Sequence, residues 1–182
     1  MLLLDSNVFI EAKNRYYAFD ICPGFWSWMD SVCGNGIGSI RNVRDELSAG
    51  QDDLAAWAKD RHDASWFMKV DDSDTQNAYA EIAGKLSEGH YTPQAMSKFL
   101  GDADSWLIAK AKALGATVVT HELPNPASKK RVLMPDVCNW FDVPFQNTFE
   151  ALRAHSAKFY LGAPGEDGAG GALNGAQNAS LW

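Results

Sequence analysis

The sequence predicts an α/β fold built around a central, mostly parallel sheet. Short apolar or β-branched runs at 2–4, 36–40 and 117–120 have the composition of buried strands. Segments with helical spacing of apolar residues lie between them. Parallel strands need long crossover connections, so alternating strands and helices favour a parallel sheet over an antiparallel one.

The predicted helices have start signals, stop signals or a continuous apolar face. Pro93 suits the first position of a helix, and Gly115 is a typical stop. One predicted helix begins at Pro23, with Phe25, Trp28, Met29 and Val32 on one face. A second follows Ser39 or Asn42 as its cap and contains Val43, Glu46 and Leu47. Further helices are predicted over 54–58, 75–86, 93–101, 103–114 and 147–155. Residues 70–74 form a polar break, and 131–134 are a further strand candidate.

A chain of 182 residues is a normal length for one domain, and 46% hydrophobic residues can build a sizeable core. We assign residues 1–161 to this domain. Residues 162–182 are rich in Gly, Ala and Asn, and their composition is typical of a flexible C-terminal tail.

Composition argues against a membrane protein and against a secreted one. No apolar run approaches the roughly 18 residues that span a bilayer, and Asp5 interrupts the leucines before a signal-peptide core could form. The three cysteines are widely spaced and contain no C-x-x-C, which fits reduced thiols. We therefore expect a cytoplasmic protein. Its net charge of −7 opposes broad electrostatic binding of nucleic acid but does not exclude an enzyme that cleaves it.

Four acidic residues, distant in the sequence, are predicted to meet at one edge of the sheet. Asp5 follows the first strand, and Glu122 comes just after the strand TVVT. Asp104 lies in the first turn of a helix, and Glu46 is expected near the start of the helix after the second strand. Ligands of parallel sheets bind beyond the carboxyl ends of the strands, where these helices begin.

Carboxylates brought that close repel one another unless a cation lies between them. Oxygen ligands suit Mg²⁺ or Mn²⁺, which lower the pKa of water and stabilise the leaving oxygen of a phosphodiester. Asp102 is a further candidate ligand. Each acid taken alone is more typical of a cap or a turn.

Four segments resemble the motif series of the PIN-domain superfamily of metal-dependent nucleases, which includes the VapC-type ribonuclease toxins. They are D-S-N-V-F at 5–9, R-D-E-L at 44–47, D-S-W-L-I-A-K-A at 104–111 and V-V-T-H-E at 118–122. The sequence of the first motif, which continues as I-E-A-K-x-R-Y-Y, is more similar still to an uncharacterised group of PIN-like bacterial proteins. The resemblance covers residues 2–155 and implies a three-layer α/β/α sandwich.

The resemblance implies that Asp5, Glu46, Asp104 and Glu122 form a catalytic metal site for Mg²⁺ or Mn²⁺. The family usually has Asp where this chain has Glu122, and the longer side chain suggests contact with the metal through water. Ser6 and Asn7 are expected to orient Asp5, and Thr120 is expected to support the far side of the site.

The activity implied by the resemblance is divalent-metal-dependent endoribonuclease cleavage of RNA, as the toxin of a toxin–antitoxin pair. An antitoxin protein and a homodimer are the implied partners. The alternative is a catalytically inert PIN-like module that serves as a protein-binding scaffold. Haloacid-dehalogenase-like phosphatases also begin with Asp after a first strand, but their second acid would fall at Asn7.

Candidate RNA contacts combine positive charge with aromatic rings, which can bind phosphates and stack on bases. They are Lys13, Arg15, Tyr16, Lys129 and Lys130. Each has a structural alternative, since the tyrosine could pack against a helix end and the lysines could lie in a solvated loop. Alternation along the strand turns His121 away from its neighbours, so catalysis by His121 is the less favoured interpretation.

Overall fold

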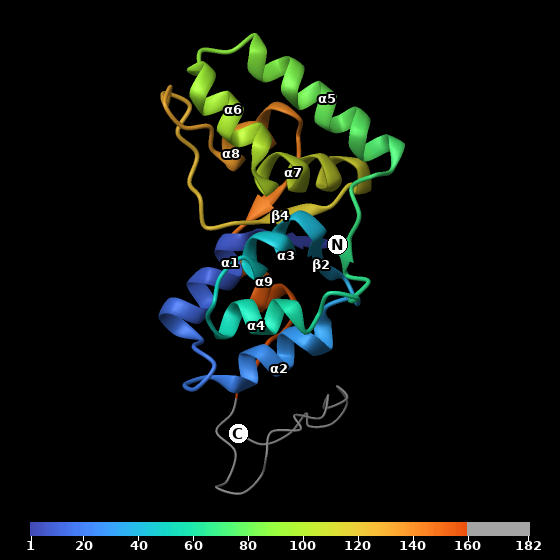
Figure 1. The fold of residues 1–182 in the computed structure, drawn as a ribbon, viewed down its shortest axis with the longest axis vertical. Coiled ribbons are helices and arrows are strands. Elements are labelled where there is room, and N and C mark those ends of the chain that lie inside the picture. Colours follow the sequence, from blue (N-terminus) through green and yellow to red (C-terminus); the bar gives the residue numbers. More distant parts are fainter. Residues whose placement is uncertain (160–182) are drawn as a thin grey trace, which may run out of the picture.

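A computed structural model of the chain describes residues 1–159, and its strands and helices alternate as predicted (Figure 1). The predicted tail at 162–182 lies outside the described residues. The strands are β1 (Leu2–Leu4), β2 (Ile37–Ile40), β3 (Phe67–Met68), β4 (Thr117–Val119) and β5 (Phe145–Gln146). The helices are α1 (Ser6–Glu11), the π-helix η1 (Ala12–Tyr16), α2 (Pro23–Val32), α3 (Arg41–Ser48), α4 (Asp53–Lys59), α5 (Ser73–Ser87), α6 (Pro93–Gly101), α7 (Ala103–Leu114), α8 (Met134–Trp140) and α9 (Thr148–Ala154).

The five strands form one parallel sheet in the order β3-β2-β1-β4-β5. The chain moves outward from β1 to β2 and β3, and then returns to place β4 on the other side of β1. The strand order therefore reverses between β1 and β4. Such a reversal opens a crevice at the carboxyl ends of the two strands, because their connections leave in opposite directions.

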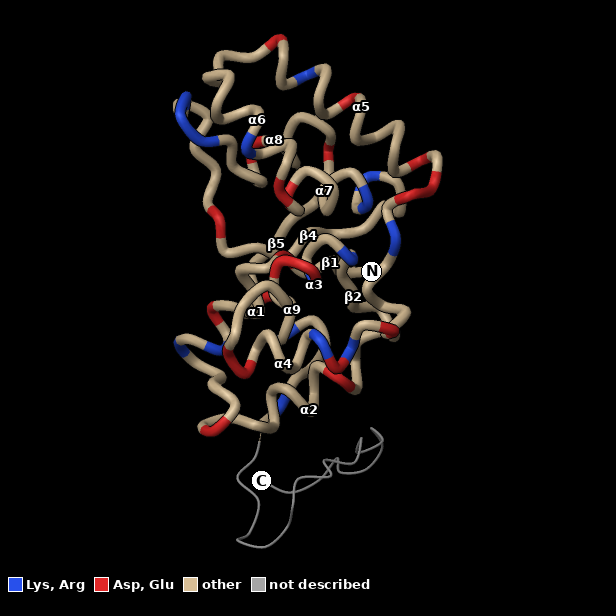
Figure 2. Tube along the Cα trace, viewed as in Figure 1, with Lys and Arg blue, Asp and Glu red and all other residues tan. Residues whose placement is uncertain are grey.

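The core lies on both faces of this sheet. Leu3, Ile40 and Val118 are fully buried strand residues, and Phe9 and Leu107 pack on them from helices. Charged residues lie mainly along the outer helices and loops (Figure 2). Within residues 1–159, the charged side chains that are buried are Asp5, Lys110 and Asp136.

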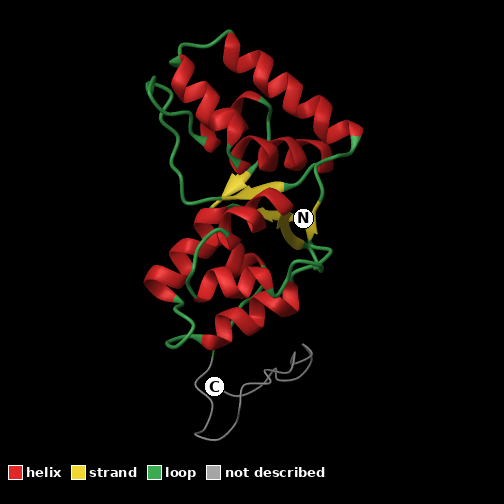
Figure 3. Ribbon diagram, viewed as in Figure 1, coloured by secondary structure: helices red, strands yellow, loops and turns green. Residues whose placement is uncertain are grey.

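The helices cover the sheet in two layers, which confirms the predicted α/β class with helices on both faces. Helices α5 to α8 lie on one side, and α1, α2, α4 and α9 lie on the other (Figures 1 and 3). Helix α3 contacts α4 and α7 and so touches both layers at the edge of the sheet. Among the described residues, no helix combines the length and apolarity needed to cross a membrane.

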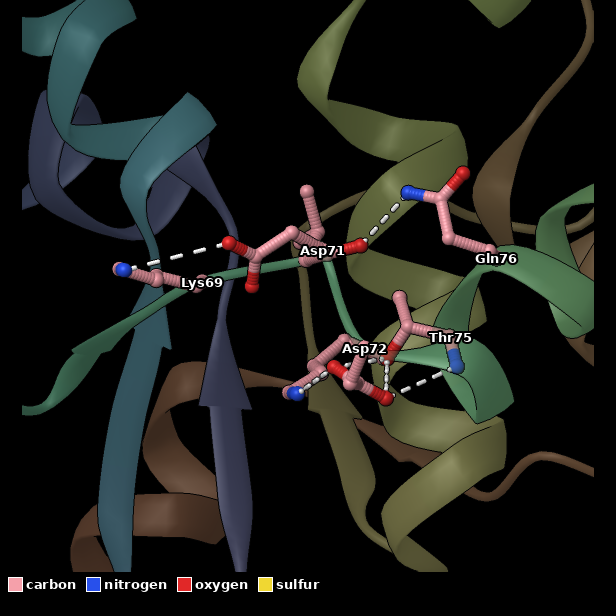
Figure 4. A network of polar contacts seen from close by, with 7 residues as sticks. Lys69, Asp71, Asp72, Thr75 and Gln76 are labelled. Carbon is pink, nitrogen blue, oxygen red and sulfur yellow. Dashed lines mark hydrogen bonds and ion pairs between the residues drawn. The ribbon is translucent and has the colours of Figure 1, made fainter.

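An ion pair between Asp72, at the start of α5, and the nearly buried Lys110 joins α5 to α7. Asp72 caps α5 by accepting hydrogen bonds from the backbone N–H and the hydroxyl of Thr75 (Figure 4). The same carboxylate accepts from Lys110 Nζ of α7 at 2.6 Å. These donors hold the pKa of Asp72 well below its usual range, with the Lys110 hydrogen bond as the largest cause. The Lys110 charge is thereby paired, although its side chain is nearly buried.

Most element predictions are confirmed, including the helix 103–114 and its stop at Gly115, whose φ is +60°. The strand predicted at 131–134 is wrong, because Met134 begins α8 and Pro135 suits the first turn of a helix. The last position in the sheet is taken by Phe145–Gln146. The predicted side-chain cap of α3, Ser39 or Asn42, is also wrong. Ser39 is still in strand β2 and donates its hydroxyl to Leu4 O at 2.6 Å, whereas Asn42 lies inside the helix.

Two glycine substitutions should change stability in opposite directions. Gly84 lies inside α5 with open space around it, so Gly84→Ala should raise the free energy of unfolding by about 0.5 to 1 kcal/mol. Gly115 has open space too, but its left-handed φ means that Gly115→Ala should lower that free energy by about 1 to 2 kcal/mol. Urea unfolding of both variants beside the wild type measures this, and a shift of the same sign in both would contradict the assigned backbone conformations.

Candidate active site

The predicted acids lie at the edge of the sheet where the strand order reverses. Asp5 follows β1 directly, and its N–H donates to Val119 O of β4 at 3.0 Å. Thr120 follows β4, and Asp104 lies in the first turn of α7. The site therefore combines the ends of two neighbouring strands, β1 and β4, with the start of helix α7.

Asp5 is almost completely buried, with 1% of its surface exposed. Its Oδ2 atom accepts hydrogen bonds from Thr120 Oγ1 at 2.9 Å and from Asn7 Nδ2 at 3.2 Å. Its Oδ1 atom is also buried, yet it has no hydrogen-bond partner among the described residues. Burial raises the pKa of Asp5 to about 6, and nearby Glu122 adds to the shift. The two donors thus fix the carboxylate while leaving one oxygen free.

Asp104 lies in the first turn of α7, and its side chain makes no hydrogen bond within residues 1–159. Burial raises its pKa to about 8, and the charges of Asp5, Glu122 and Glu46 add to the rise in that order, followed by Asp102. Each of the predicted acids therefore contributes to the electrostatic environment of this one carboxyl group. The sheet and the helices do bring these distant acids together.

Glu46 is held by hydrogen bonds at both oxygens. It is the sixth of the eight residues of α3, not near the helix start as the sequence suggested. Its Oε1 accepts from the N–H of Ala103 at 2.9 Å, and its Oε2 accepts from Ser6 Oγ at 2.5 Å. Ser6 thus orients Glu46 and not Asp5, which corrects its predicted partner. Glu46 links α1, α3 and the beginning of α7.

Glu122 is also held at both oxygens. Its Oε1 pairs with Arg131 at 2.5 Å, and its Oε2 accepts from the N–H of Met134 at 2.8 Å. Only 8% of its side chain is exposed, whereas the Arg131 side chain is 69% exposed. Sequence reasoning did not assign Arg131 a role in the site. The basic run that contains it was visible, but only the folded loop brings it back onto Glu122.

The free carboxylate oxygens fit a divalent cation bound by few protein ligands. Among residues 1–159, no three Asp, Glu, His or Cys side chains are grouped so that they could hold a metal ion together. Among the four acids, the carboxylate oxygens without a hydrogen-bond partner are Asp5 Oδ1 and both oxygens of Asp104. Mg²⁺ is commonly held by one or two carboxylates and several waters. Asp5 and Asp104 suit that arrangement, while Glu46 and Glu122 hold the surrounding elements.

Asp102 and His121 lie at the margin of the site. Asp102 is the N-cap residue of α7, makes no side-chain capping bond there and raises the pKa of Asp104. His121 is exposed, and its Nε2 lies 2.8 Å from the Thr148 hydroxyl at the start of α9. This contact directs the imidazole toward α9 and supports the sequence argument against a catalytic histidine.

The predicted RNA contacts separate into two groups. Lys13 pairs with Asp52, Arg15 pairs with Glu11, and Tyr16 is exposed with its ring edge on Phe149. Lys129 and Lys130 are exposed on the loop between β4 and α8 and form no ion pair among the described residues.

The comparisons with known proteins give a family without an assigned function. A family model described as "Domain of unknown function (DUF4411)" matches residues 2–159. The chain belongs to this family. No curated protein matches this DUF4411 chain at a significant level.

Three solved structures resemble the DUF4411 chain. One is VapBC2 from Rickettsia felis bound to a DNA fragment from its promoter, with 14% identity, 80% of this chain and 97% of that chain covered, and a TM-score of 0.48. Another is FitAB bound to the IR36 DNA fragment, with 19% identity, coverages of 81% and 94%, and a TM-score of 0.47. The third is FitAcB from Neisseria gonorrhoeae, with 19% identity, coverages of 82% and 99%, and a TM-score of 0.48.

The raised pKa values predict a stability that falls with increasing pH when no metal is present. Unfolded carboxyl groups titrate near 4, whereas folded Asp104 keeps its proton up to about pH 8 and Asp5 up to about pH 6. Between these values the folded state binds more protons than the unfolded state, so the free energy of unfolding decreases as the pH rises. Asp104→Asn should flatten this dependence and stabilise the chain by about 1 to 2 kcal/mol at pH 8.

Thermal unfolding between pH 5 and pH 8.5 in a chelator tests this prediction. Asp20→Asn, which changes an exposed aspartate between η1 and α2, is the matched control and should follow the wild type. If the wild type and Asp104→Asn lost stability in parallel as the pH rose, Asp104 would not be the source of the pH dependence.

Proposed function

We propose that the protein is a divalent-metal-dependent endoribonuclease that hydrolyses RNA phosphodiesters. The observation that carries the proposal is the buried, unpartnered Oδ1 of Asp5 beside Asp104, at the point where the strand order reverses. Leaving a carboxylate oxygen buried without a partner is costly, and so is placing a second carboxyl group next to it. A bound cation would remove both costs. The motif resemblance to PIN-domain nucleases supports the same site and the same substrate class.

Each residue then has a role that follows from its contacts. Asp5 and Asp104 would hold Mg²⁺ or Mn²⁺. When bound, such an ion lowers the pKa of water and stabilises developing charge on a phosphodiester. Thr120 and Asn7 fix Asp5 by its other oxygen. Glu46 positions the first turn of α7, and therefore Asp104, through the Ala103 N–H.

The second candidate function is an inert module of the same fold that binds a partner protein. The observation that favours it is the occupation of Glu46 and Glu122, since every oxygen of both side chains already accepts a hydrogen bond or pairs with Arg131. A metal would have to bind those two acids in addition to these contacts, through the second lone pair of an oxygen. Metal-dependent cleavage distinguishes the candidates.

Cleavage of a pool of structured RNAs, transfer RNAs included, is the direct test. With Mg²⁺ or Mn²⁺ the wild type should cut, and Asp5→Asn and Asp104→Asn should each reduce the rate by more than about 100-fold. Glu46→Gln should have a smaller effect, on the order of 10- to 100-fold, because Glu46 acts by positioning. Asp20→Asn should cut like the wild type.

Equal cutting by the wild type and Asp5→Asn would indicate a contaminating nuclease. If no protein cuts, the thermal midpoint at pH 8 with and without Mn²⁺ decides what remains. Stabilisation that Asp104→Asn abolishes would keep the metal site, whereas no stabilisation would favour the inert module.

We further propose that the protein acts as the toxin of a toxin–antitoxin pair, on the basis of the motif resemblance to VapC-type toxins. Expression of the wild type alone should arrest bacterial growth, and expression of Asp5→Asn to the same level should not. Co-expression of the protein encoded by the neighbouring gene should restore growth. Unaffected growth with soluble wild type present would contradict the toxin role but not the nuclease chemistry.

A further inference from the structure

Within residues 1–159, Arg131 is the one lysine or arginine whose side chain contacts any of the four acids of the candidate site. Its Nη2 donates to Glu122 Oε1 at 2.5 Å. The partners of Asp5 and Glu46 are neutral side chains and a backbone N–H. Asp104 has no side-chain partner in the same part of the chain. Arg131 therefore supplies the positive charge that the described residues place in contact with the site.

Glu122 uses only part of the Arg131 guanidinium. The Glu122 side chain is 8% exposed, whereas that of Arg131 is 69% exposed. Nη2 makes the bond to Glu122, and neither Nε nor Nη1 of Arg131 has a hydrogen bond within residues 1–159. A guanidinium presents its N–H groups as a rigid planar fork that matches the oxygens of a phosphate. Arg131 is thus fixed on one side and keeps donors free on the other.

The backbone that carries Arg131 is also held in place. The Ser128 hydroxyl donates to Arg131 O at 2.6 Å, and the Ser128 N–H donates to Asn125 O at 3.0 Å. The Thr92 N–H, just before α6, donates to Lys129 O at 2.9 Å. Because the loop and the guanidinium are both anchored before any ligand arrives, binding a ligand here orders few further groups.

The anchored guanidinium lies beside the proposed metal ligands. The charge of Glu122 raises the pKa of both Asp5 and Asp104, which places Glu122 near both carboxyl groups. Arg131 is one hydrogen bond further out and more exposed. An anion that bound the free side of Arg131 would therefore lie next to the site.

The charge of the site favours a cation at this position when the substrate is RNA. Four carboxylates repel a phosphodiester, and a divalent ion balances the charge of only two of them. Arg131 balances that of Glu122. Lys129 and Lys130 directly precede it with exposed side chains, and Figure 2 shows this basic run as a stretch of blue on the loop beside α6 and α8. An anionic backbone that approached over this loop would be attracted.

We propose that Arg131 binds a phosphate of the RNA at the metal site and that Glu122 holds the guanidinium in position for it. The proposal rests on the proposed nuclease function. Arg131 is then a substrate-binding residue and Glu122 a positioning residue. A contact to the phosphate backbone fixes the register of the strand but does not read its bases, so it acts on every RNA sequence alike.

A purely structural role for Arg131 makes a different prediction. An almost buried carboxylate without a partner is costly, so Arg131 could serve only to neutralise Glu122. In that case any defect of Arg131→Gln comes from the unpaired Glu122 charge. Removing that charge as well would then abolish the defect, whereas the loss of a phosphate contact would persist.

RNA binding in a chelator tests the contact without metal and without cleavage. The full chain with Asp104→Asn is the parent, because this change lowers the negative charge of the site and prevents cutting. Adding Arg131→Gln should weaken binding of a short single-stranded RNA about 10-fold, and by a similar factor for two unrelated sequences. The slope of log affinity against log salt concentration should become shallower by about 1.

The matched control is Arg153→Gln, which changes an exposed arginine in the last turn of α9 and should bind RNA like the parent. Equal affinity and equal salt dependence of the parent and Arg131→Gln would overturn the proposal. No RNA binding by the parent at millimolar concentration would overturn it too. A loss confined to one of the two RNA sequences would also contradict a backbone contact.

A pair of further variants excludes the structural role and keeps the fold intact. On the same parent, Glu122→Gln with Arg131→Gln should bind RNA at least about 5-fold more weakly than Glu122→Gln alone. The glutamine oxygen can still accept from Arg131 in the second protein, and the first contains no unpaired charge at this position. Equal binding by the two would assign Arg131 to the neutralisation of Glu122. Thermal unfolding checks that both are folded.

Kinetics with Asp104 intact separate this proposal from the nuclease itself. With Mn²⁺, Arg131→Gln should raise KM about 10-fold and change kcat less, because the contact is already present in the bound substrate. Stabilisation by Mn²⁺ should equal that of the wild type, since Arg131 is no metal ligand. Cleavage with unchanged KM and salt dependence would disprove only the phosphate contact. RNA binding that depends on Arg131 without any cleavage would disprove only the nuclease.

Discussion

The confinement of carboxylates at the carboxyl ends of β1 and β4 is the constraint around which the rest of the structure is arranged. Asp5 is buried with one oxygen unpartnered, and Asp104 is close enough for their charges to interact. A fold gains nothing from this arrangement, because burial and repulsion both disfavour the charged forms. The proposed function accounts for the arrangement, since a site that is unstable when empty would be stabilised by a bound cation.

The acids divide into two kinds by their hydrogen bonds. Asp5 and Asp104 keep free oxygens, whereas Glu46 and Glu122 give theirs to the protein. Glu46 accepts from Ala103 and thereby fixes the turn that carries Asp104. Glu122 accepts from Met134 and pairs with Arg131, which closes the loop between β4 and α8. The glutamates therefore shape the places where the aspartates act.

The layer formed by helices α5 to α8 carries Asp104 and adjoins the basic loop between β4 and α8. Helix α7 carries Asp104 at one end and is joined to the start of α5 by the ion pair of Lys110 with Asp72. Helix α8 carries Asp136, and the loop before it carries Lys129 and Lys130. These lysines form a local positive charge on a chain whose net charge is −7.

The sequence by itself determined the class of the fold and those helices and strands that their own residues indicate. Apolar triplets such as Leu2–Leu4, the proline at the start of α6 and the glycine after α7 are local features, and local physics decides them. It also placed the acids at one edge, because that depends only on the direction of parallel strands. The two-residue strands β3 and β5 are too short to have a pattern of their own, and only pairing with β2 and β4 makes them strands.

Tertiary structure alone decided what each side chain contacts. Ser6 is next to Asp5 in the chain but donates to Glu46, and Arg131 pairs with a residue nine positions before it because the loop folds back. One cavity is lined by both His90 and Asp136, which no periodicity relates. Hydrogen bonds and cavities depend on distances in space, and a sequence shows distances only along the chain. Which acids keep an oxygen without a partner, and which accept hydrogen bonds from the protein, was therefore decided by the tertiary structure alone.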